Sequence, residues 1–240
     1  MPRSLTFSFG KLDKAAITQV VTQPWEYFAK ALTAKPPEIA SKDARGWYIP
    51  ATFSAPHRHS DYFVARDALT FDFDHVTLDT YGLVQIRFAE IAYAMYTTFS
   101  HRYDAPRFRC VVPLSRSVSE DEYGAISRRI AEGVGIELVA RESFVAPQMM
   151  YMPGRRLGGE FASRVGPAEI FLDADTVLAS YANWSDRTSW PHRREGDDLH
   201  AESAKITPPC EKPGIVGEFC RKFDVPSAIA RFDLPYKRVM

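Results

Sequence analysis

Short strands separated by helices dominate the hydrophobic pattern of this chain. Runs rich in β-branched and aromatic residues predict the strands, and apolar residues spaced three or four positions apart predict the helices. The predicted strands cover residues 5–9, 47–53, 68–73, 91–98, 107–114 and 148–152. The predicted helices cover residues 13–33 with a break at Pro24, residues 78–90, residues 119–132, and the end of a segment over 168–181 that begins like a strand. This mixture is typical of an α+β sheet protein.

The helix over 119–132 has the clearest boundaries. Ser119 followed by Glu122 matches a capping box, in which each side chain bonds to the main-chain N–H of the other residue. Gly133 and Gly135 follow the last apolar position, as is common at the end of a helix.

The composition changes after Asn183. Residues 1–183 are long enough to form one domain with a sizeable core. Residues 184–210 are mostly polar and charged, with Trp184 and Trp190 as large apolar exceptions, so we expect a linker or a loosely packed arm. Helical apolar spacing returns over 211–240, which predicts a short helical segment at the C-terminus.

Charge and cysteine content limit the classes of protein to which this chain could belong. The 30 basic and 30 acidic residues cancel, so net charge neither favours nor excludes a polyanionic partner. Arginine outnumbers lysine 21 to 9, and its planar fork suits phosphate. The three cysteines form no CxxC pair, which argues against a disulfide framework and a zinc site. No apolar stretch could be a signal peptide or cross a membrane, so we expect a soluble protein of a reducing compartment.

An acidic pair on the strand over 68–73 is the most informative segment. Side chains alternate along a strand, so Asp72 and Asp74 share one face while Phe71 and Phe73 share the other. Two adjacent carboxylates repel each other unless a cation lies between them. Mg²⁺ or Mn²⁺ would supply that cation. The alternative is a strand end with two solvated acids.

Histidine and arginine side chains follow the acidic pair along the sequence. Ser100 and His101 come directly after the strand over 91–98, and Arg107 and Arg109 share a face of the next strand. Beside a metal-binding pair, these groups suit a triphosphate. The alternative is a surface hairpin with solvated side chains.

A two-metal site usually needs a third carboxylate. Glu142 and Glu137 are the candidates, and we prefer Glu142. An exposed surface glutamate is the alternative for each.

The order of these motifs resembles the catalytic core of the archaeo-eukaryotic primase superfamily, in its phage and plasmid primase-polymerase branch. The resemblance is carried by residues 69–75, by YTTFSHRYDAPRFRCVVPLSRSVS at 96–119, and by ESFVAPQMMYMP at 142–153. The segment EKPGIVGEFCR at 211–221 resembles a stretch that follows the core in such proteins, often ahead of a helicase.

The resemblance implies a fold, a set of ligands and a reaction. The fold would be a catalytic core with an RRM-like antiparallel sheet. Asp72 and Asp74 would bind metal with Glu142, although the third motif usually supplies an aspartate. His101 would contact the nucleotide's phosphates, with Ser100, Arg107 and Arg109 around it. The chain would act as a DNA primase/polymerase in phage or plasmid replication, in the cytoplasm. It would use two Mg²⁺ or Mn²⁺ ions, NTPs or dNTPs, a single-stranded or primed DNA template, and a possible helicase domain or partner.

Two other functions compete with this interpretation. A haloacid-dehalogenase-type phosphatase fits the D-x-D strand but needs a downstream lysine, and the sequence has none between Lys42 and Lys205. A replication initiator that nicks DNA, or only binds it, could use the His57-x-His59 pair. The polar neighbours of these two histidines favour a solvated loop.

Overall fold

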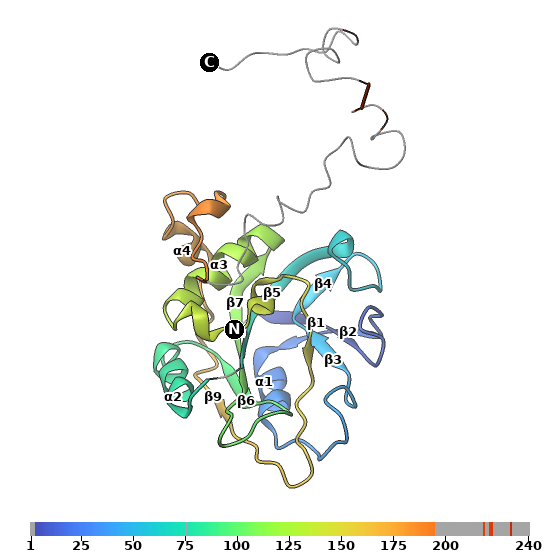
Figure 1. Ribbon diagram of the computed structural model, residues 1–240, viewed down its shortest axis with the longest axis vertical. Coiled ribbons are helices and arrows are strands. Elements are labelled where there is room, and N and C mark those ends of the chain that lie inside the picture. Colours follow the sequence, from blue (N-terminus) through green and yellow to red (C-terminus); the bar gives the residue numbers. More distant parts are fainter. Residues whose placement is uncertain (1–2, 75, 195–217, 219–220, 223–230, 232–240) are drawn as a thin grey trace. The chain divides into compact units, whose positions relative to one another are not determined.

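In this computed structural model the chain divides into two compact units, residues Met1–Asp197 and residues Asp198–Met240 (Figure 1). The structure describes residues 3–74, 76–194, 218, 221–222 and 231. The described residues of the second unit have helical backbone, but the rest of the helical segment predicted over 211–240 lies outside the described residues, as do positions 195–210 of the predicted arm. Within the described part of the chain, no helix is both long enough and apolar enough to cross a membrane.

The first unit contains two antiparallel sheets. The first sheet has the strand order β2-β1-β3-β8, and the second has the order β4-β5-β7-β6-β9. The strands are β1 (Ser4–Gly10), β2 (Gln19–Pro24), β3 (Trp47–Ile49), β4 (Ala51–Phe53), β5 (Phe63–Phe73), β6 (Ala94–Thr97), β7 (Phe108–Val118), β8 (Met150–Tyr151) and β9 (Ser163–Val165). Together with the helices, these sheets confirm the α+β class that the hydrophobic pattern predicts.

Four α-helices and four short 3₁₀ turns accompany the sheets in the described residues of this unit. The helices are α1 (Trp25–Thr33), α2 (Leu78–Arg87), α3 (Glu120–Glu132) and α4 (Ala174–Ala179). The turns are η1 (Ser60–Tyr62), η2 (Ile136–Leu138), η3 (Arg141–Phe144) and η4 (Arg187–Ser189).

A hydrophobic core fills the space between the two sheets and α1. Helix α1 contributes Trp25, Phe28, Ala29 and Leu32, all of them buried. Phe28 stacks on Phe7 of the first sheet with ring centroids 3.7 Å apart. Val111 of β7 and Tyr96 of β6 bring the second sheet into the same cluster. This face of the second sheet is the one that carries the acidic pair at its end.

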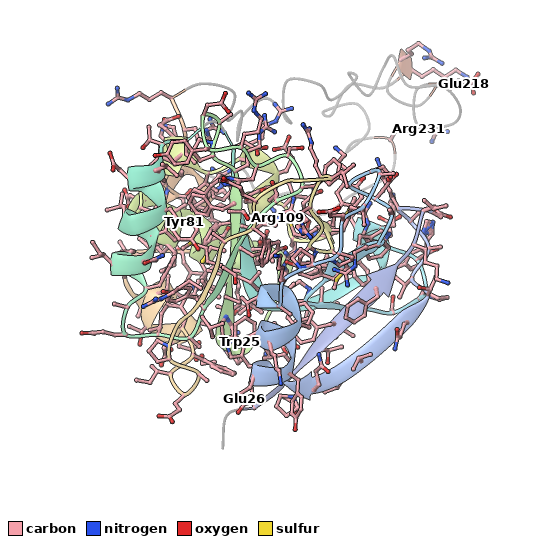
Figure 2. The ribbon with its side chains drawn as sticks, turned by 90° about the horizontal axis from the view of Figure 1, so that it is seen from below. Trp25, Glu26, Tyr81, Arg109, Glu218 and Arg231 are labelled. Atoms are coloured by element: carbon pink, nitrogen blue, oxygen red, sulfur yellow. The ribbon has the colours of Figure 1, made fainter. Side chains whose placement is uncertain are left out.

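Helix α2 covers the opposite face of the second sheet. Tyr81 on α2 packs edge-on against Phe108 of β7 at 5.1 Å, and Phe108 stacks on Phe73 of β5 at 4.6 Å. Figure 2 labels Tyr81 on α2 and Trp25 on α1, with the strands of the second sheet between the two helices. Because the phenylalanines of β5 pack on this side, alternation directs the neighbouring aspartates to the other side.

The structure corrects three of the predicted elements. The predicted helix over 13–33 is helical only from Trp25, because the β-branched run in residues 20–22 pairs with β1 as β2. The predicted strand over 47–53 is divided at Pro50 into β3, which belongs to the first sheet, and β4, which belongs to the second. Strand β7 continues beyond Pro113, which lies next to a shift of register where β6 no longer pairs with β7.

Two other features connect the sequence to the fold of this unit. The capping box at the start of α3 is confirmed, because Ser119 and Glu122 bond to each other's main chain. Trp190, which falls in the predicted arm, is only 5% exposed. A Cβ on Gly124 of α3 would lie 2.7 Å from its ring. The start of this segment therefore packs closely on α3, in contrast to the loose packing expected from its polarity.

Candidate active site

Strands β5 and β7 pair so that two acids face two arginines. Asp72 lies directly opposite Arg109 in the antiparallel register, and Phe73 lies opposite Phe108. The Arg109 guanidinium contacts the Asp72 carboxylate at 3.0 Å, and Arg107 contacts Asp74 at 3.4 Å. The alternation predicted for each strand is therefore matched across the sheet, which places two cationic and two anionic groups together at one end of it.

The main chain of Asp72 is held by a segment distant in sequence. Its N–H donates to the Ser143 hydroxyl at 3.0 Å, and its carbonyl accepts from the N–H of Ala140 at 2.8 Å. The segment 140–143 includes most of the turn η3, and Ser143 is fully buried. The position of Asp72 is thus fixed by β7 and by the segment 140–143.

Arg109 connects the acidic pair to the first sheet. It is 9% exposed and also donates to the main-chain carbonyl of Tyr151 at 3.0 Å. Figure 2 labels it near the middle of this unit. Burial lowers the pKa of Arg109, but the Asp72 carboxylate and two nearby tyrosines outweigh burial, and the net shift is upward. The guanidinium therefore stays charged and serves as a fixed counterion for Asp72.

Two buried tyrosines continue the row of polar side chains formed by Asp72 and Arg109 from the second sheet to the first. The hydroxyls of Tyr48 and Tyr96 are 2.8 Å apart, and Tyr96 lies opposite Arg109 in the β6–β7 register. Burial raises the pKa of both hydroxyls, so both remain protonated at neutral pH. Each can donate a hydrogen bond, and neither adds a negative charge beside Asp72.

A pocket of about 180 Å³ lies against this row. It brings together the acidic pair, both arginines and Ser100 from the predicted site. The remaining residues that line it are Lys42, Tyr96, Thr98, Phe99, Gln148, Met149, Met150, Tyr151, Met152 and Pro153. Three cationic side chains and two carboxylates therefore border one cavity.

One oxygen of Asp72 lacks a hydrogen-bond partner within the described residues. Its Oδ2 atom accepts from Arg109, whereas Oδ1 is buried and has no such bond. A buried carboxylate oxygen without a partner is costly. Mg²⁺ is usually held by one or two carboxylates together with water and substrate phosphates. The Asp72–Asp74 pair beside an open pocket fits one such ion.

His101 lies in the loop that joins β6 to β7. Its Nδ1 accepts a hydrogen bond from the main-chain N–H of Arg107 at 3.1 Å, so in the neutral ring Nε2 carries the proton. Burial lowers the pKa of His101, although Glu160 opposes the shift. His101 lines another cavity, of about 590 Å³, with Lys35 and Glu160. Arg107 links it to the acidic pair, because the same residue contacts Asp74.

Neither candidate for the third carboxylate lines the pocket. Glu142 has a 56% exposed side chain that contacts Arg141 at 3.4 Å. Glu137 accepts from the main-chain N–H of Arg194 at 2.6 Å. Among the residues that the structure describes, no three His, Cys, Asp or Glu side chains are grouped to hold a metal ion. Glu142 is adjacent to Ser143, which holds the Asp72 main chain, but its own carboxylate is directed elsewhere.

Sequence reasoning missed two polar residues of the pocket. Lys42 lies in a loop thirty positions before Asp72, and its ammonium lies 5.5 Å from the centre of the Tyr151 ring. Gln148 stands at the start of a predicted strand, although β8 begins only at Met150. Lys42 belongs to none of the motifs, and Gln148 lies within the segment 142–153 that carries the family resemblance, but no pattern there marks it as a pocket residue.

A family model decides the relationship of the chain. The model of the VapE N-terminal domain matches residues 8–193. The chain belongs to the VapE N-terminal domain family. The relationship to the primase-polymerase superfamily that the motifs indicated is confirmed at this level. No curated protein matches the chain.

A similar solved structure is the AEP domain of the primase-polymerase (PrimPol) from cyanophage S-2L. It is 10% identical with a TM-score of 0.43, and the match covers 75% of this chain and 89% of that chain.

Proposed function

We propose that this member of the VapE N-terminal domain family is a DNA primase/polymerase that transfers nucleotides on a DNA template. The observation that carries the proposal is the pocket in which Asp72, Asp74, Arg107 and Arg109 converge, with one Asp72 oxygen lacking a hydrogen bond within the described residues. Carboxylates that bind a cation beside arginines that bind phosphate are the groups that phosphoryl transfer requires. The partners would be a single-stranded or primed DNA template, NTPs or dNTPs, and a helicase domain or subunit, in the cytoplasm.

Asp72 and Asp74 would hold a Mg²⁺ or Mn²⁺ ion. When bound, the ion would supply Lewis-acid chemistry, lowering the pKa of the attacking hydroxyl and neutralising charge on the phosphates. Arg109 would keep Asp72 ionised and in place through its buried contact. A second ion held with Glu142 stays a prediction, because that side chain lies outside the pocket.

The reaction would join a primer or first nucleotide to the next one. The 3′-hydroxyl oxygen attacks the α-phosphorus, a phosphodiester P–O bond forms, the bond to pyrophosphate breaks, and the hydroxyl proton passes to solvent. Arg107 and Lys42 at the pocket would bind the negative β- and γ-phosphates. A hydrogen bond from His101 Nε2 to a phosphate oxygen stays a prediction, because His101 lines another cavity and is not among the residues of this pocket.

The decisive experiment is nucleotide incorporation on single-stranded and primed DNA, with Mg²⁺ or Mn²⁺ and with both nucleotide types. We expect incorporation by the wild type and a loss of at least about 10³-fold in the Asp72→Asn/Asp74→Asn variant, because removal of charge stabilisation at a reacting phosphate has effects of this size. Asp104→Asn is the matched control, since Asp104 forms an exposed ion pair with Arg102 in the neighbouring hairpin. Activity that survives the double substitution would refute this site.

Two observations favour a second candidate function, a replication initiator that binds DNA without polymerase activity. Both acids already contact arginines, and the described residues contain no group of three metal-ligating side chains. DNA binding without metal-dependent incorporation by the wild type would support this function in place of the first.

A further inference from the structure

Arg66 is a fully buried cation that has no part in the proposed chemistry. It lies on β5, and burial lowers its pKa. Its guanidinium donates to the carbonyl oxygens of Ala68 at 3.2 Å, Gln148 at 3.0 Å and Ala146, and to the hydroxyl of Thr70. All four acceptors are uncharged. The hydrogen bonds of Arg66 are therefore made to neutral polar groups, whereas a buried charge usually pairs with an opposite charge.

The acceptors indicate what this buried charge does. Moving a cation out of water is costly, and an apolar side chain of similar volume often stabilises a core as well. An apolar side chain could not donate to several carbonyls at once, whereas the planar fork of arginine can. Two of these carbonyls belong to the segment 140–148, which ends beside the pocket. Arg66 therefore ties that segment to β5.

Tyr123 on α3 anchors the other half of the same segment. The Arg66 guanidinium lies over the Tyr123 ring, 4.5 Å from its centre. The Tyr123 hydroxyl donates to the carbonyl of Ser143 at 2.8 Å, and the Ser143 hydroxyl accepts from the N–H of Asp72. Arg66 and Tyr123 thus hold both halves of a segment that contacts the Asp72 main chain at one end and forms a pocket wall with Gln148 at the other.

We propose that Arg66 is a positioning residue for the nucleotide pocket. This inference rests on the proposed function. By fixing the segment 140–148, Arg66 keeps the wall at Gln148 and the main chain of Asp72 in place when a nucleotide enters. A pre-formed wall spares the bound nucleotide the cost of ordering that segment, so loosening it raises KM more than it lowers kcat.

The test compares Arg66→Lys with Arg3→Lys. Both substitutions keep the positive charge and remove the guanidinium fork. Arg3 is the matched control, because its bonds go to Asp67, Leu114 and Ser117. Nucleotide KM and kcat are measured on a primed template, and amide hydrogen exchange is measured over residues 140–149 and over α3. Thermal unfolding of each variant shows that both are compared in the folded state.

We expect Arg66→Lys to raise KM about tenfold with kcat within about threefold, and to speed exchange over 140–149 at least tenfold while α3 stays within twofold. Changes of this size are expected when one or two hydrogen bonds to the segment are lost. Arg3→Lys should leave KM and exchange over 140–149 within twofold, even if it lowers the unfolding temperature as much. If Arg66→Lys behaves like Arg3→Lys in both measurements, Arg66 has only a structural role and the proposal is wrong.

Two further arms keep the result decisive. If Arg66→Lys does not fold, Arg66→Gln takes its place, since the amide has two N–H donors and cannot reach all four acceptors of the guanidinium. Faster exchange over 140–149 with a raised KM supports the proposal, and unchanged values for both overturn it. If the wild type incorporates no nucleotide, the proposed function fails on its own, and exchange alone then decides whether Arg66 fixes the segment.

Discussion

Replacing Arg109 tests the central ion pair of the site. Arg109→Met keeps much of the side-chain volume but removes the counterion of Asp72. The side chains of Arg109 and Asp72 are 11% and 21% exposed. Removing one partner of a buried pair costs about 3–5 kcal/mol, whereas an exposed pair is worth about 0–1 kcal/mol. Because this pair keeps some exposure, we expect about 3 kcal/mol, and the lost bond to the Tyr151 carbonyl adds about 1 kcal/mol.

The assay is urea unfolding followed by tryptophan fluorescence, since Trp25 and Trp47 are fully buried in the first unit. A loss of about 4 kcal/mol corresponds to a fall of about 8–16 °C in the unfolding temperature of a unit of this size. A double-mutant cycle with Asp72→Asn isolates the pair, and we expect a coupling free energy of about 1–3 kcal/mol. Additive single-variant effects, or a loss below about 1 kcal/mol for Arg109→Met, would show that the pair is screened by solvent and would refute the reasoning.

Three more predictions concern His101, Gly124 and Lys42. The pKa of His101 is lowered in the folded protein, so the unfolded chain binds the proton more readily. The contribution of His101 to the unfolding free energy is therefore complete above the ordinary pKa near 6.5 and is lost as pH falls below that value. The difference in unfolding free energy between wild type and His101→Gln should shrink between pH 8 and pH 5. Gly124→Ala should fail to give the usual gain of about 1 kcal/mol in a helix, because its Cβ would lie 2.7 Å from the Trp190 ring, and a stabilised variant in urea unfolding would contradict this. Lys42→Ala should weaken nucleotide binding about fivefold to tenfold in a titration at low salt and much less at high salt, and a salt-independent loss would argue against a charge effect.

Local rules predicted those parts of the fold that short segments decide for themselves. The capping box at Ser119 needs only residues three apart, and the shared face of Asp72 and Asp74 needs only strand alternation. The helix expected over 13–33 shows the limit of such rules. Its first half is drawn into β2 because β1 offers a partner, and the sequence near residue 20 does not reveal that partner.

For the candidate site, too, the sequence predicted what depends on neighbouring residues and did not predict what depends on contacts between distant segments. The sequence placed Arg107 and Arg109 on one face of a strand, but only the β5–β7 register sets Arg109 opposite Asp72. Lys42 and Gln148 reach the pocket from loops, where no periodic spacing marks them. The sequence offers Glu142 and Glu137 as candidates for the third carboxylate, whereas the structure shows that the Glu142 side chain is 56% exposed and contacts Arg141.

The contacts that Ala140 and Ser143 make with Asp72 also bear on self-association. Strand β4 pairs with β5 as far as Arg66, and beyond that point β7 is the one strand that pairs with β5 among the described residues. The segment 140–143 bonds to this free edge of β5 at Asp72. A chain cut before residue 140 would leave the N–H and the carbonyl of Asp72 exposed at a sheet edge, the kind of margin onto which a second molecule adds a strand. The segment that holds the main chain of Asp72 thus also covers part of a sheet edge to which another molecule could otherwise add a strand.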